Sequence, residues 1–488
     1  MLYFKNNKKL PDLFSFTSIK DYHTFLASTP DGCVQAVKHY LAAIENNNHL
    51  NAFLEVYIDE ALQRAEELDT QRKQGLPLGR LHGVVVSIKD VICYKGHHVS
   101  AASKILMNFE SVYSATAVER LLDEGAIIIG RNNCDEFAMG SSSENSAYGI
   151  VKNAADTSRV PGGSSGGSAV AVQADLVMIS LGSDTGGSVR QPADFCGIIG
   201  MKPTYGRISR YGLIAYASSF DQIGIFGKNL SDVALALEVM SGEDNFDSTA
   251  SSKPVANYEE HSKKEITGKK IAYFKQVLDH PGIDPEIKVA TENYIQSLKD
   301  KGFTVEAINF DWLDYIVPTY YILTTAEASS NLSRFDGVRY GYRSTEGIDD
   351  LNEMYKQSRN KGFGKEVQRR ILLGSFVLSA GYFDAYFTKA QQVRRLLSEN
   401  TTKVFEQYDA IISPTVPSPA FRLGEKSDDS VAMYLADIYT VYANLVGIPS
   451  ISLPLFKHSN GMPFGLQLMT NHFEEELMFA LSNSFLSK

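Results

Sequence analysis

"RVPGGSSGGSAVAVQADLVMISLGSDTGGSVRQP", residues 159–192, is the stretch from which both the fold and the chemistry of this chain can be approached. It contains two clusters of glycine and serine, GGSSGGS and DTGGS, separated by a run of mostly small and apolar residues. Glycine lets backbone N–H groups converge where a side chain would block access, and such groups bind a phosphate or the oxyanion of an acyl transfer. The stretch therefore poses a choice between nucleotide binding and acyl transfer.

The segments on either side of this stretch alternate between strand and helix patterns. GVVVSIKD (83–90) is typical of a buried strand that ends on a lysine–aspartate pair, and residues 115–124 and 126–130 follow as a helix and a short strand. VMISLGSD (177–184) is also a strand pattern, and the alternation returns at 271–310 and at 408–469. Such repeats predict an α/β fold with a large mixed, mainly parallel sheet covered by helices on both faces.

The same patterns predict how the chain is organised. Apolar residues at helical spacing between 34 and 44 indicate an N-terminal helical segment, residues 1–70, packed on the core. The main domain is then 71–488, with a polar linker or excursion near 243–269 and a helical insertion near 318–400. Ser231 is expected to cap a helix that ends near Gly242, and the turn at 459–461 is expected to join the last two strands as a hairpin.

Composition excludes several classes of function. The net charge is −10, with 47 basic and 57 acidic residues, which argues against a broad basic face for nucleic acid. We find no apolar run of membrane-spanning length and no signal-peptide pattern, so we expect a cytoplasmic protein that contacts no membrane. The four cysteines show no metal-ligand spacing, which predicts buried free thiols and no metal site.

The phosphate interpretation fails on spacing. A P-loop needs a lysine inside the loop, and neither cluster contains one, while GGSSGG lacks the dinucleotide spacing G-x-G-x-x-G. For acyl transfer, GGSSG fits the nucleophile elbow G-x-S-x-G around Ser164, which would require a downstream aspartate and histidine. None of the later histidines has suggestive surroundings, and the elbow leaves DTGGS without a role.

A second assignment uses both clusters. Ser188 is the nucleophile, Ser164 relays its proton, and Lys89 at the end of the strand 83–90 is the final base. A fully buried lysine can lose its charge, because burial lowers its pKa by as much as ~3–5 units. The backbone N–H groups of Thr185, Gly186, Gly187 and Ser188 would hold the oxyanion. Taken singly, a lysine at a strand end is usually a solvated surface residue, and GGSSGG is usually a flexible turn. The hypothesis rests on the occurrence of the lysine and both glycine–serine clusters together in one chain.

In this order and spacing, Lys89, Ser164 and Ser188 resemble the Lys–cis-Ser–Ser triad of the amidase signature family. LHGVVVSIKD, GGSSGGSAVAV and GSDTGGSVRQPADFCGIIGMKPTYGR are similar to that family's core, and the resemblance runs from about residue 35 to 479. It implies the amidase signature fold for 71–488 and a cis peptide bond between Gly163 and Ser164.

Within this family the chain is most similar to the branch of glutamine-hydrolysing subunits in tRNA-dependent amidotransferases, through stretches such as CDEFAMGSSSENSAYG (134–149) and ISPTVPSPAF (412–421). The resemblance implies that Arg370, Asp437 and Tyr320 bind the substrate glutamine. Taken alone, Arg370 and Asp437 could equally be helix-surface residues and Tyr320 a core residue.

The branch also implies partners. Ammonia from glutamine would pass to a heterotrimer's B and C subunits, which convert glutamyl-tRNA(Gln) to glutaminyl-tRNA(Gln). ATP and Mg²⁺ would be used by the partner subunit, which would also make most contacts to the charged tRNA, and no cofactor is expected in this chain. Two alternatives remain: a stand-alone amidase that hydrolyses small amides, and a catalytically inactive structural subunit.

Overall fold

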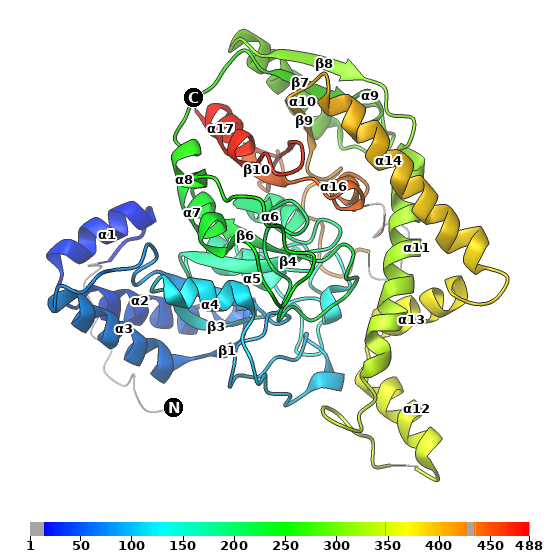
Figure 1. The fold of residues 1–488 in the computed structure, drawn as a ribbon, viewed down its shortest axis with the longest axis horizontal. Coiled ribbons are helices and arrows are strands. Elements are labelled where there is room, and N and C mark those ends of the chain that lie inside the picture. Colours follow the sequence, from blue (N-terminus) through cyan, green and yellow to red (C-terminus); the bar gives the residue numbers. More distant parts are fainter. Residues whose placement is uncertain (1–13, 347, 427–433, 435, 488) are drawn as a thin grey trace.

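One sheet of eleven strands runs through the described part of this computed structural model, which comprises residues 14–346, 348–426, 434 and 436–487 (Figure 1). In spatial order the strands are β1 (Phe53–Val56), β3 (Ile127–Asn132), β2 (Val85–Lys89), β4 (Ile179–Asp184), β6 (Gln222–Gly227), β5 (Ile199–Lys202), β10 (Ser450–Lys457), β11 (Pro463–Met469), β9 (Ala410–Pro414), β7 (Lys270–Phe274) and β8 (Thr304–Ile308). The predicted α/β fold with a large mixed sheet is confirmed.

The expectation of a mainly parallel sheet is wrong. Among the described strands, β2 pairs in parallel with β3 and β4, and β7 pairs in parallel with β8 and β9, but the other six pairings are antiparallel. Two reversals, from β5 to β6 and from β10 to β11, occur where no helix lies between consecutive strands, whereas the reversal from β1 to β2 spans α3 (Ile58–Lys73). The connection 203–221 returns β6 between β4 and β5, and the predicted turn at 459–461 makes β10 and β11 a hairpin.

Helices surround this sheet. In chain order they are α1 (Ile19–Ser28), α2 (Gly32–Asn46), α3 (Ile58–Lys73), α4 (Thr116–Asp123), α5 (Gly166–Gln173), α6 (Arg190–Cys196), α7 (Leu230–Met240), α8 (Tyr258–His261), α9 (Lys275–Leu278), α10 (Pro285–Asp300), α11 (Leu313–Asn331), α12 (Leu351–Gly362), α13 (Lys365–Val377), α14 (Lys389–Phe405), α16 (Val441–Val446) and α17 (Glu475–Leu486). No described helix is both long and apolar enough to cross a membrane.

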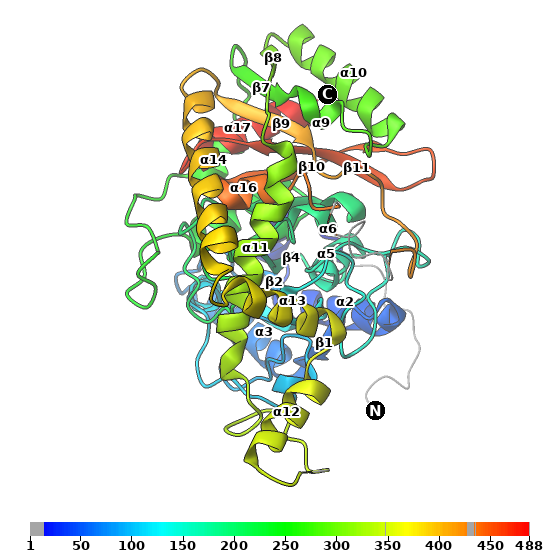
Figure 2. The same cartoon turned by 90° about the vertical axis from the view of Figure 1, so that its right-hand side faces the viewer.

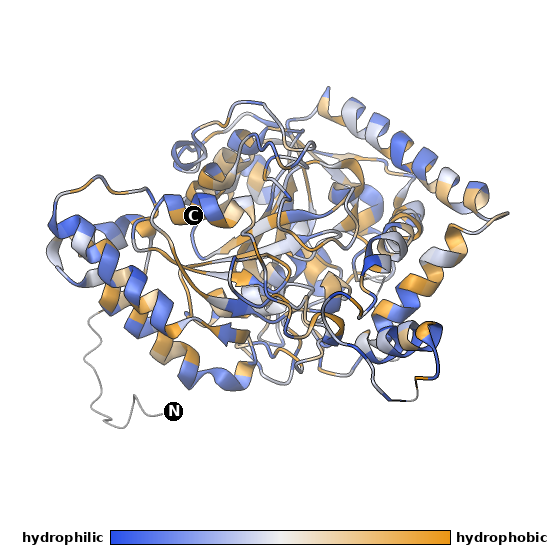
Figure 3. Ribbon diagram, turned by 60° about the horizontal axis from the view of Figure 1, so that its bottom comes forward, coloured by the Kyte–Doolittle hydropathy of each residue, from blue (hydrophilic) through white to orange (hydrophobic). Residues whose placement is uncertain are grey.

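Two glycines of β6 demonstrate that helices cover both faces, as predicted. A Cβ on Gly224 would meet Val189, directly before α6, whereas a Cβ on Gly227 would meet Val233 of α7. Residues three apart in a strand point to opposite faces, so α6 and α7 lie on opposite sides of the sheet. Figure 3 shows the hydrophobic colour running through the central strands, as expected for a sheet that is buried on both faces.

The carboxyl ends of two parallel neighbours position the site. β2 ends on Lys89 and β4 ends on Asp184, and every residue of both strands is buried. Because the two strands run in parallel, these polar residues emerge at the same edge of the sheet. Figure 2 shows α11, α13 and α14 in front of the central strands, where α11 packs against both α13 and α14.

The predicted cap of α7 is wrong by two residues. Asn229 precedes the helix, and its Oδ1 accepts from the N–H of Asp232 at 2.9 Å, whereas Ser231 lies in the first turn and donates its hydroxyl proton to Asn229. Both residue types cap helices, and the asparagine stands one position before the first helical residue.

Four further expectations can be placed on the structure. The cysteines at 33, 93, 134 and 196 are all free and buried, as predicted. The segment 243–269 contains only the short helix α8, and 318–400 holds most of α11 together with α12, α13 and much of α14. The described part of 1–70 holds α1, α2, most of α3 and also strand β1 of the main sheet, with residues 1–13 outside it. The domain limits themselves stay a prediction.

Candidate active site

Lys89 lies at the centre of a group of buried hydroxyls. Its Nζ contacts Ser164 Oγ at 2.7 Å, Ser165 Oγ at 2.9 Å and Ser183 Oγ at 2.9 Å. Lys89 and Ser164 are both 0% exposed. A protonated amine would donate to all three hydroxyls, whereas a neutral amine keeps a lone pair that can accept a proton from one of them. The structure therefore brings together the predicted base and relay.

Burial changes the charge of this amine. It lowers the pKa of Lys89 from its usual 10.5 to about 8, although Cys134 and Asp135 act in the opposite direction. A base with a pKa near the working pH is partly neutral there and can still take a proton with useful driving force. The lowered pKa of Lys89 is therefore that expected of a general base, whereas a surface lysine would stay protonated.

The loop before α5 holds Ser164 in place. The Gly163–Ser164 peptide bond is cis, as the family resemblance implied. Neighbouring backbone and side chains press against the loop glycines, and a Cβ on Gly163 would lie 2.2 Å from Asp135 Oδ2. The Gly163 N–H donates to Gln191 Oε1 at 2.9 Å, and the Ser164 carbonyl accepts from the Asp135 N–H at 3.1 Å. This loop has little freedom left once the sheet is formed.

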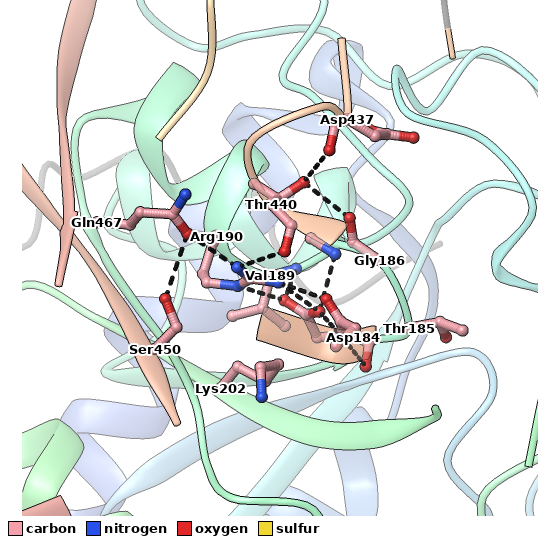
Figure 4. Close-up of polar contacts among 12 residues, drawn as sticks. Asp184, Thr185, Gly186, Val189, Arg190, Lys202, Asp437, Thr440, Ser450 and Gln467 are labelled. Carbon is pink, nitrogen blue, oxygen red and sulfur yellow. Dashed lines mark hydrogen bonds and ion pairs between the residues drawn. The ribbon is translucent and has the colours of Figure 1, made fainter. Parts of the chain in front are cut away.

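The second glycine loop, residues 184–190, is held by a buried ion pair (Figure 4). Arg190 contacts Asp184 through Nε at 3.2 Å and Nη2 at 3.1 Å, and both residues are 0% exposed. Burial by itself raises the pKa of Asp184, but the Arg190 guanidinium together with Lys202 and Asn444 outweighs burial and brings that pKa to about 2. The carboxylate is thus permanently charged and can accept backbone N–H groups of the loop.

This arrangement corrects one part of the predicted oxyanion hole. The Gly187 N–H donates to Asp184 Oδ1 at 2.8 Å, so it points into the protein and is not a candidate donor to substrate. Within the described residues, no hydrogen bond occupies the N–H groups of Thr185, Gly186 or Ser188. The candidate donors are therefore these three, and the position of a glycine in the motif did not reveal which way its N–H faces.

Ser188 lies next to the relay without a direct side-chain contact to it. The Ser165 N–H donates to the Ser188 carbonyl at 3.3 Å, and Ser188 is 9% exposed, at the outer side of the fully buried Lys89 cluster. In the described part of the chain, no hydrogen bond joins Ser188 Oγ to Ser164 Oγ. The proton transfer between these two hydroxyls stays a prediction.

Arg370 of α13 points inward, because it is 3% exposed and lies within an aromatic group. Its Nη1 donates to Tyr216 Oη at 2.8 Å and its Nε to Glu366 Oε1 at 2.8 Å. The guanidinium carbon is 5.2 Å from the ring centroid of Tyr321 and 5.6 Å from that of Tyr434, within the range of a cation–π interaction. The helix-surface alternative for this arginine is thereby excluded.

Asp437, which lies shortly before α16 in the chain, contacts the same aromatic group. It is 7% exposed and accepts hydrogen bonds from Ser141 Oγ at 2.9 Å and Tyr321 Oη at 3.0 Å. Burial raises the pKa of Asp437 to about 7, although the hydrogen bonds from Ser141 and Tyr321 lower it. Tyr321 thus joins the two predicted substrate-binding charges, since its hydroxyl contacts Asp437 while its ring faces Arg370.

Tyr320 connects these charges to the nucleophile loop. A Cβ on Gly186 would lie only 2.4 Å from Tyr320 Oη, so this tyrosine packs directly on the loop and the position requires glycine. Its ring also meets Phe220 edge-on at 5.9 Å. All three predicted substrate-binding residues therefore gather beside residues 184–190, which places binding charges and candidate nucleophile in one region.

Several residues of this region were not singled out from the sequence. The structure adds Ser165 and Ser183 beside Lys89, the Asp184–Arg190 pair, Ser141 and Tyr321 beside Asp437, and Thr440 beside Gly186. The Asp184–Arg190 pair had a visible signal, because opposite charges flank the glycines of an otherwise uncharged stretch. The others depend on contacts between distant segments and carried no local signal.

Comparison with known proteins agrees with this geometry. The family model described as Amidase matches residues 35–479. The chain belongs to the amidase signature family.

Among the described residues no group of three His, Cys, Asp or Glu side chains could hold a metal ion.

Three relatives show how similar the chain is to known members of the amidase signature family. The A subunit of glutamyl-tRNA(Gln) amidotransferase from Koribacter versatilis is 52% identical over 438 residues, which cover 90% of this chain and 91% of that protein. The crystal structure of the corresponding A subunit from Thermotoga maritima is 38% identical with a TM-score of 0.78, over 96% of this chain and 94% of that chain. A peptide amidase from Stenotrophomonas maltophilia is 26% identical with a TM-score of 0.81, over 97% of each chain.

Proposed function

We propose that this chain is the glutamine-hydrolysing subunit of a tRNA-dependent amidotransferase. The observation that carries the proposal is the placement of a buried guanidinium and a buried carboxylate, joined by Tyr321, beside the glycine loop that contains Ser188. Glutamine carries an α-carboxylate and an α-ammonium, and these two charges need partners of opposite sign. Relatives that are half identical to this chain are named as A subunits of glutamyl-tRNA(Gln) amidotransferase.

The chemistry begins at the amide side chain of glutamine. Ser188 Oγ attacks the carbonyl carbon, and its proton passes to Ser164 Oγ while the Ser164 proton passes to neutral Lys89. The N–H groups of Thr185, Gly186 and Ser188 receive the developing oxyanion, an effect worth about 2.7–4 kcal/mol per donor. The carbon–nitrogen bond then breaks, and the nitrogen leaves as ammonia after it receives a proton back from the relay.

Water completes the cycle. It attacks the ester between the glutamyl group and Ser188 and gives a proton to Lys89 through Ser164. The ester bond then breaks, and the proton returns from Lys89 through Ser164 to Ser188 Oγ, which releases glutamate and restores the serine. In both halves Lys89 alternates between neutral and protonated forms, and its lowered pKa keeps both forms accessible near neutral pH.

Recognition is assigned to the charged pair and to Tyr320. Arg370 binds the α-carboxylate, Asp437 binds the α-ammonium, and Tyr320 forms a wall of the same pocket against Gly186. Because Asp437 has a pKa of about 7, its charge is complete only above that pH, and a bound ammonium would favour the charged form further.

The rest of the reaction belongs to the complex. The relatives are named as subunits of an amidotransferase, and we assign ammonia transfer to a heterotrimer with B and C subunits, in the cytoplasm. ATP and Mg²⁺ would act in the partner subunit, which would also bind the charged tRNA, consistent with a net charge of −10 on this chain.

The decisive experiment assembles the chain with the B and C subunits and supplies glutamyl-tRNA(Gln), ATP and glutamine. We expect glutamine-dependent formation of glutaminyl-tRNA(Gln), and a labelled acyl group on Ser188 when glutamine is trapped on the enzyme. Amidation that never draws on glutamine would reject the proposal. A label on Ser164 would instead support the nucleophile elbow.

A further inference from the structure

One peptide unit of the nucleophile loop is held at both of its polar atoms. The Gly186 carbonyl accepts from Thr440 Oγ1 at 2.7 Å, and the Gly187 N–H donates to Asp184 Oδ1 at 2.8 Å. These two groups belong to the same planar peptide, so holding both determines the orientation of the plane. The N–H groups of Gly186 and Ser188, which are candidate oxyanion donors, belong to the peptide units directly before and after this one in the chain.

The two anchors of this peptide are themselves connected. The Thr440 carbonyl accepts from Arg190 Nη1 at 2.9 Å, and Arg190 Nη2 contacts Asp184 Oδ1 at 3.1 Å. The hydrogen bonds therefore form a closed ring that leaves the peptide at Gly186, passes through Thr440, Arg190 and Asp184, and returns at Gly187. Figure 4 shows Gly186, Thr440, Arg190 and Asp184 together. Thr440, Arg190 and Asp184 are each 0% exposed, so water cannot replace any of these contacts.

Thr440 also belongs to the turn that carries Asp437. Its N–H and its Oγ1 both approach the Asp437 carbonyl at 3.1 Å. The side chain leaves no free space on the loop side, because a Cβ on Gly187 would lie 2.2 Å from Thr440 Oγ1. Thr440 therefore contacts both the turn at Asp437 and the Gly186–Gly187 peptide.

We propose that Thr440 is a positioning residue that couples recognition of the substrate ammonium at Asp437 to the aim of the oxyanion-binding N–H groups. This inference rests on the proposed glutaminase function and deepens it. Binding energy from a part of the substrate that does not react is then used at the reacting carbonyl, which raises kcat and hardly affects KM. The hydroxyl of Thr440 carries the effect, because it makes the contact to the loop.

The test compares Thr440→Val with Thr440→Ser in the assembled complex. Valine has nearly the shape of threonine without the hydroxyl, and we expect kcat for glutamine to fall by about 10-fold or more, less than the ~10²–10³ that loss of an oxyanion donor causes. KM should change little, and Thr440→Ser should restore most of the loss. Thr291→Val is the matched control, since Thr291 on α10 is a buried threonine whose hydroxyl, among the described residues, bonds only within its own helix.

A second substrate separates positioning from a merely structural role. 4-Carbamoylbutanoate is glutamine without its α-ammonium, so it cannot engage Asp437. We expect Thr440→Val to lower kcat for glutamine much more than kcat for 4-carbamoylbutanoate. The ratio of kcat for glutamine to kcat for 4-carbamoylbutanoate should therefore fall in the variant. Thr440→Ala serves in the same comparison if the valine variant does not assemble.

The outcomes are distinct. Wild-type kcat in Thr440→Val, or an equal fall with both substrates, overturns this inference and leaves the proposed function standing. A wild-type complex that releases no ammonia from glutamine overturns the proposed function, and the inference with it.

Discussion

The two halves of the candidate site use burial in opposite ways. Around Lys89 the amine contacts three neutral hydroxyls, and burial drives it toward the uncharged form against the opposing effect of Cys134 and Asp135. Around Arg370 and Asp437 two opposite charges share an aromatic group, where weak screening strengthens their attraction for a zwitterion. The first half is built to move a proton and the second to pair with the two charges of a zwitterion.

This difference teaches how substitutions should divide between kcat and KM. Loss of a group in the proton-moving half should remove the chemical step, whereas loss of a charge in the recognition half should weaken both binding and orientation of glutamine. The pKa values of the two halves converge, since burial brings Lys89 down to about 8 and Asp437 up to about 7. Both halves consequently respond to pH in the same range.

The largest expected effect is on the proton-moving half. Lys89→Ala and Ser188→Ala should each reduce glutamine hydrolysis by about 10⁴-fold or more, because the members of such a relay act as a unit. The measurement is ammonia release from glutamine by the assembled complex. Ammonium supplied externally should still support amidation of glutamyl-tRNA(Gln), which shows that the variants fold and assemble. Substantial glutaminase activity in either variant would refute the assigned roles.

The next effect concerns the recognition half. Arg370→Ala should lower kcat/KM for glutamine by about 30- to 5,000-fold, the range for loss of one partner of a buried charged hydrogen bond, while hydrolysis of a small neutral amide is spared. Arg369→Ala is the matched control, because Arg369 is the adjacent arginine of α13, with a side chain 54% exposed. An equal loss for glutamine and the neutral amide would place Arg370 outside recognition and would favour a stand-alone amidase.

The pH dependence tests both halves together. Lys89 must be neutral and Asp437 must be charged, so both requirements are met at higher pH. We expect kcat/KM for glutamine to fall about tenfold per pH unit below about 8 and more steeply below about 7, where Asp437 also takes up a proton. With 4-carbamoylbutanoate the second, steeper part should disappear. A rate that is independent of pH between 6 and 8 would exclude Lys89 as the base.

The smallest effect concerns the support of Asp437. Ser141→Ala removes one hydrogen bond to the carboxylate, and KM for glutamine should rise about 5-fold, as expected for roughly 1 kcal/mol. Ser142→Ala is its control, because the neighbouring Ser142 Oγ has no hydrogen-bond partner among the described residues. Equal KM values for the two variants would remove Ser141 from the recognition half.

Sequence patterns found the strands and the residues of the triad because their signals are local. The strand 83–90 ends on Lys89 as expected, and the structure brings Lys89 and Ser164 into contact across 75 residues of chain. The orientation of the Gly187 N–H was not predictable in the same way. It depends on a carboxylate that Arg190 keeps charged, and the motif shows only that a glycine is present.

The sequence alone determined three features: the order of the two glycine-rich loops, the lysine at the end of a strand, and the lack of a lysine inside either loop. Each depends only on which residues stand close together in the chain. Tertiary structure alone decided that Ser183 and Ser165 surround Lys89, that β6 lies between β4 and β5, and that Thr440 reaches Gly186 across 254 residues. The physical reason is that these contacts arise from packing of distant segments, whose partners leave no periodic trace in either segment.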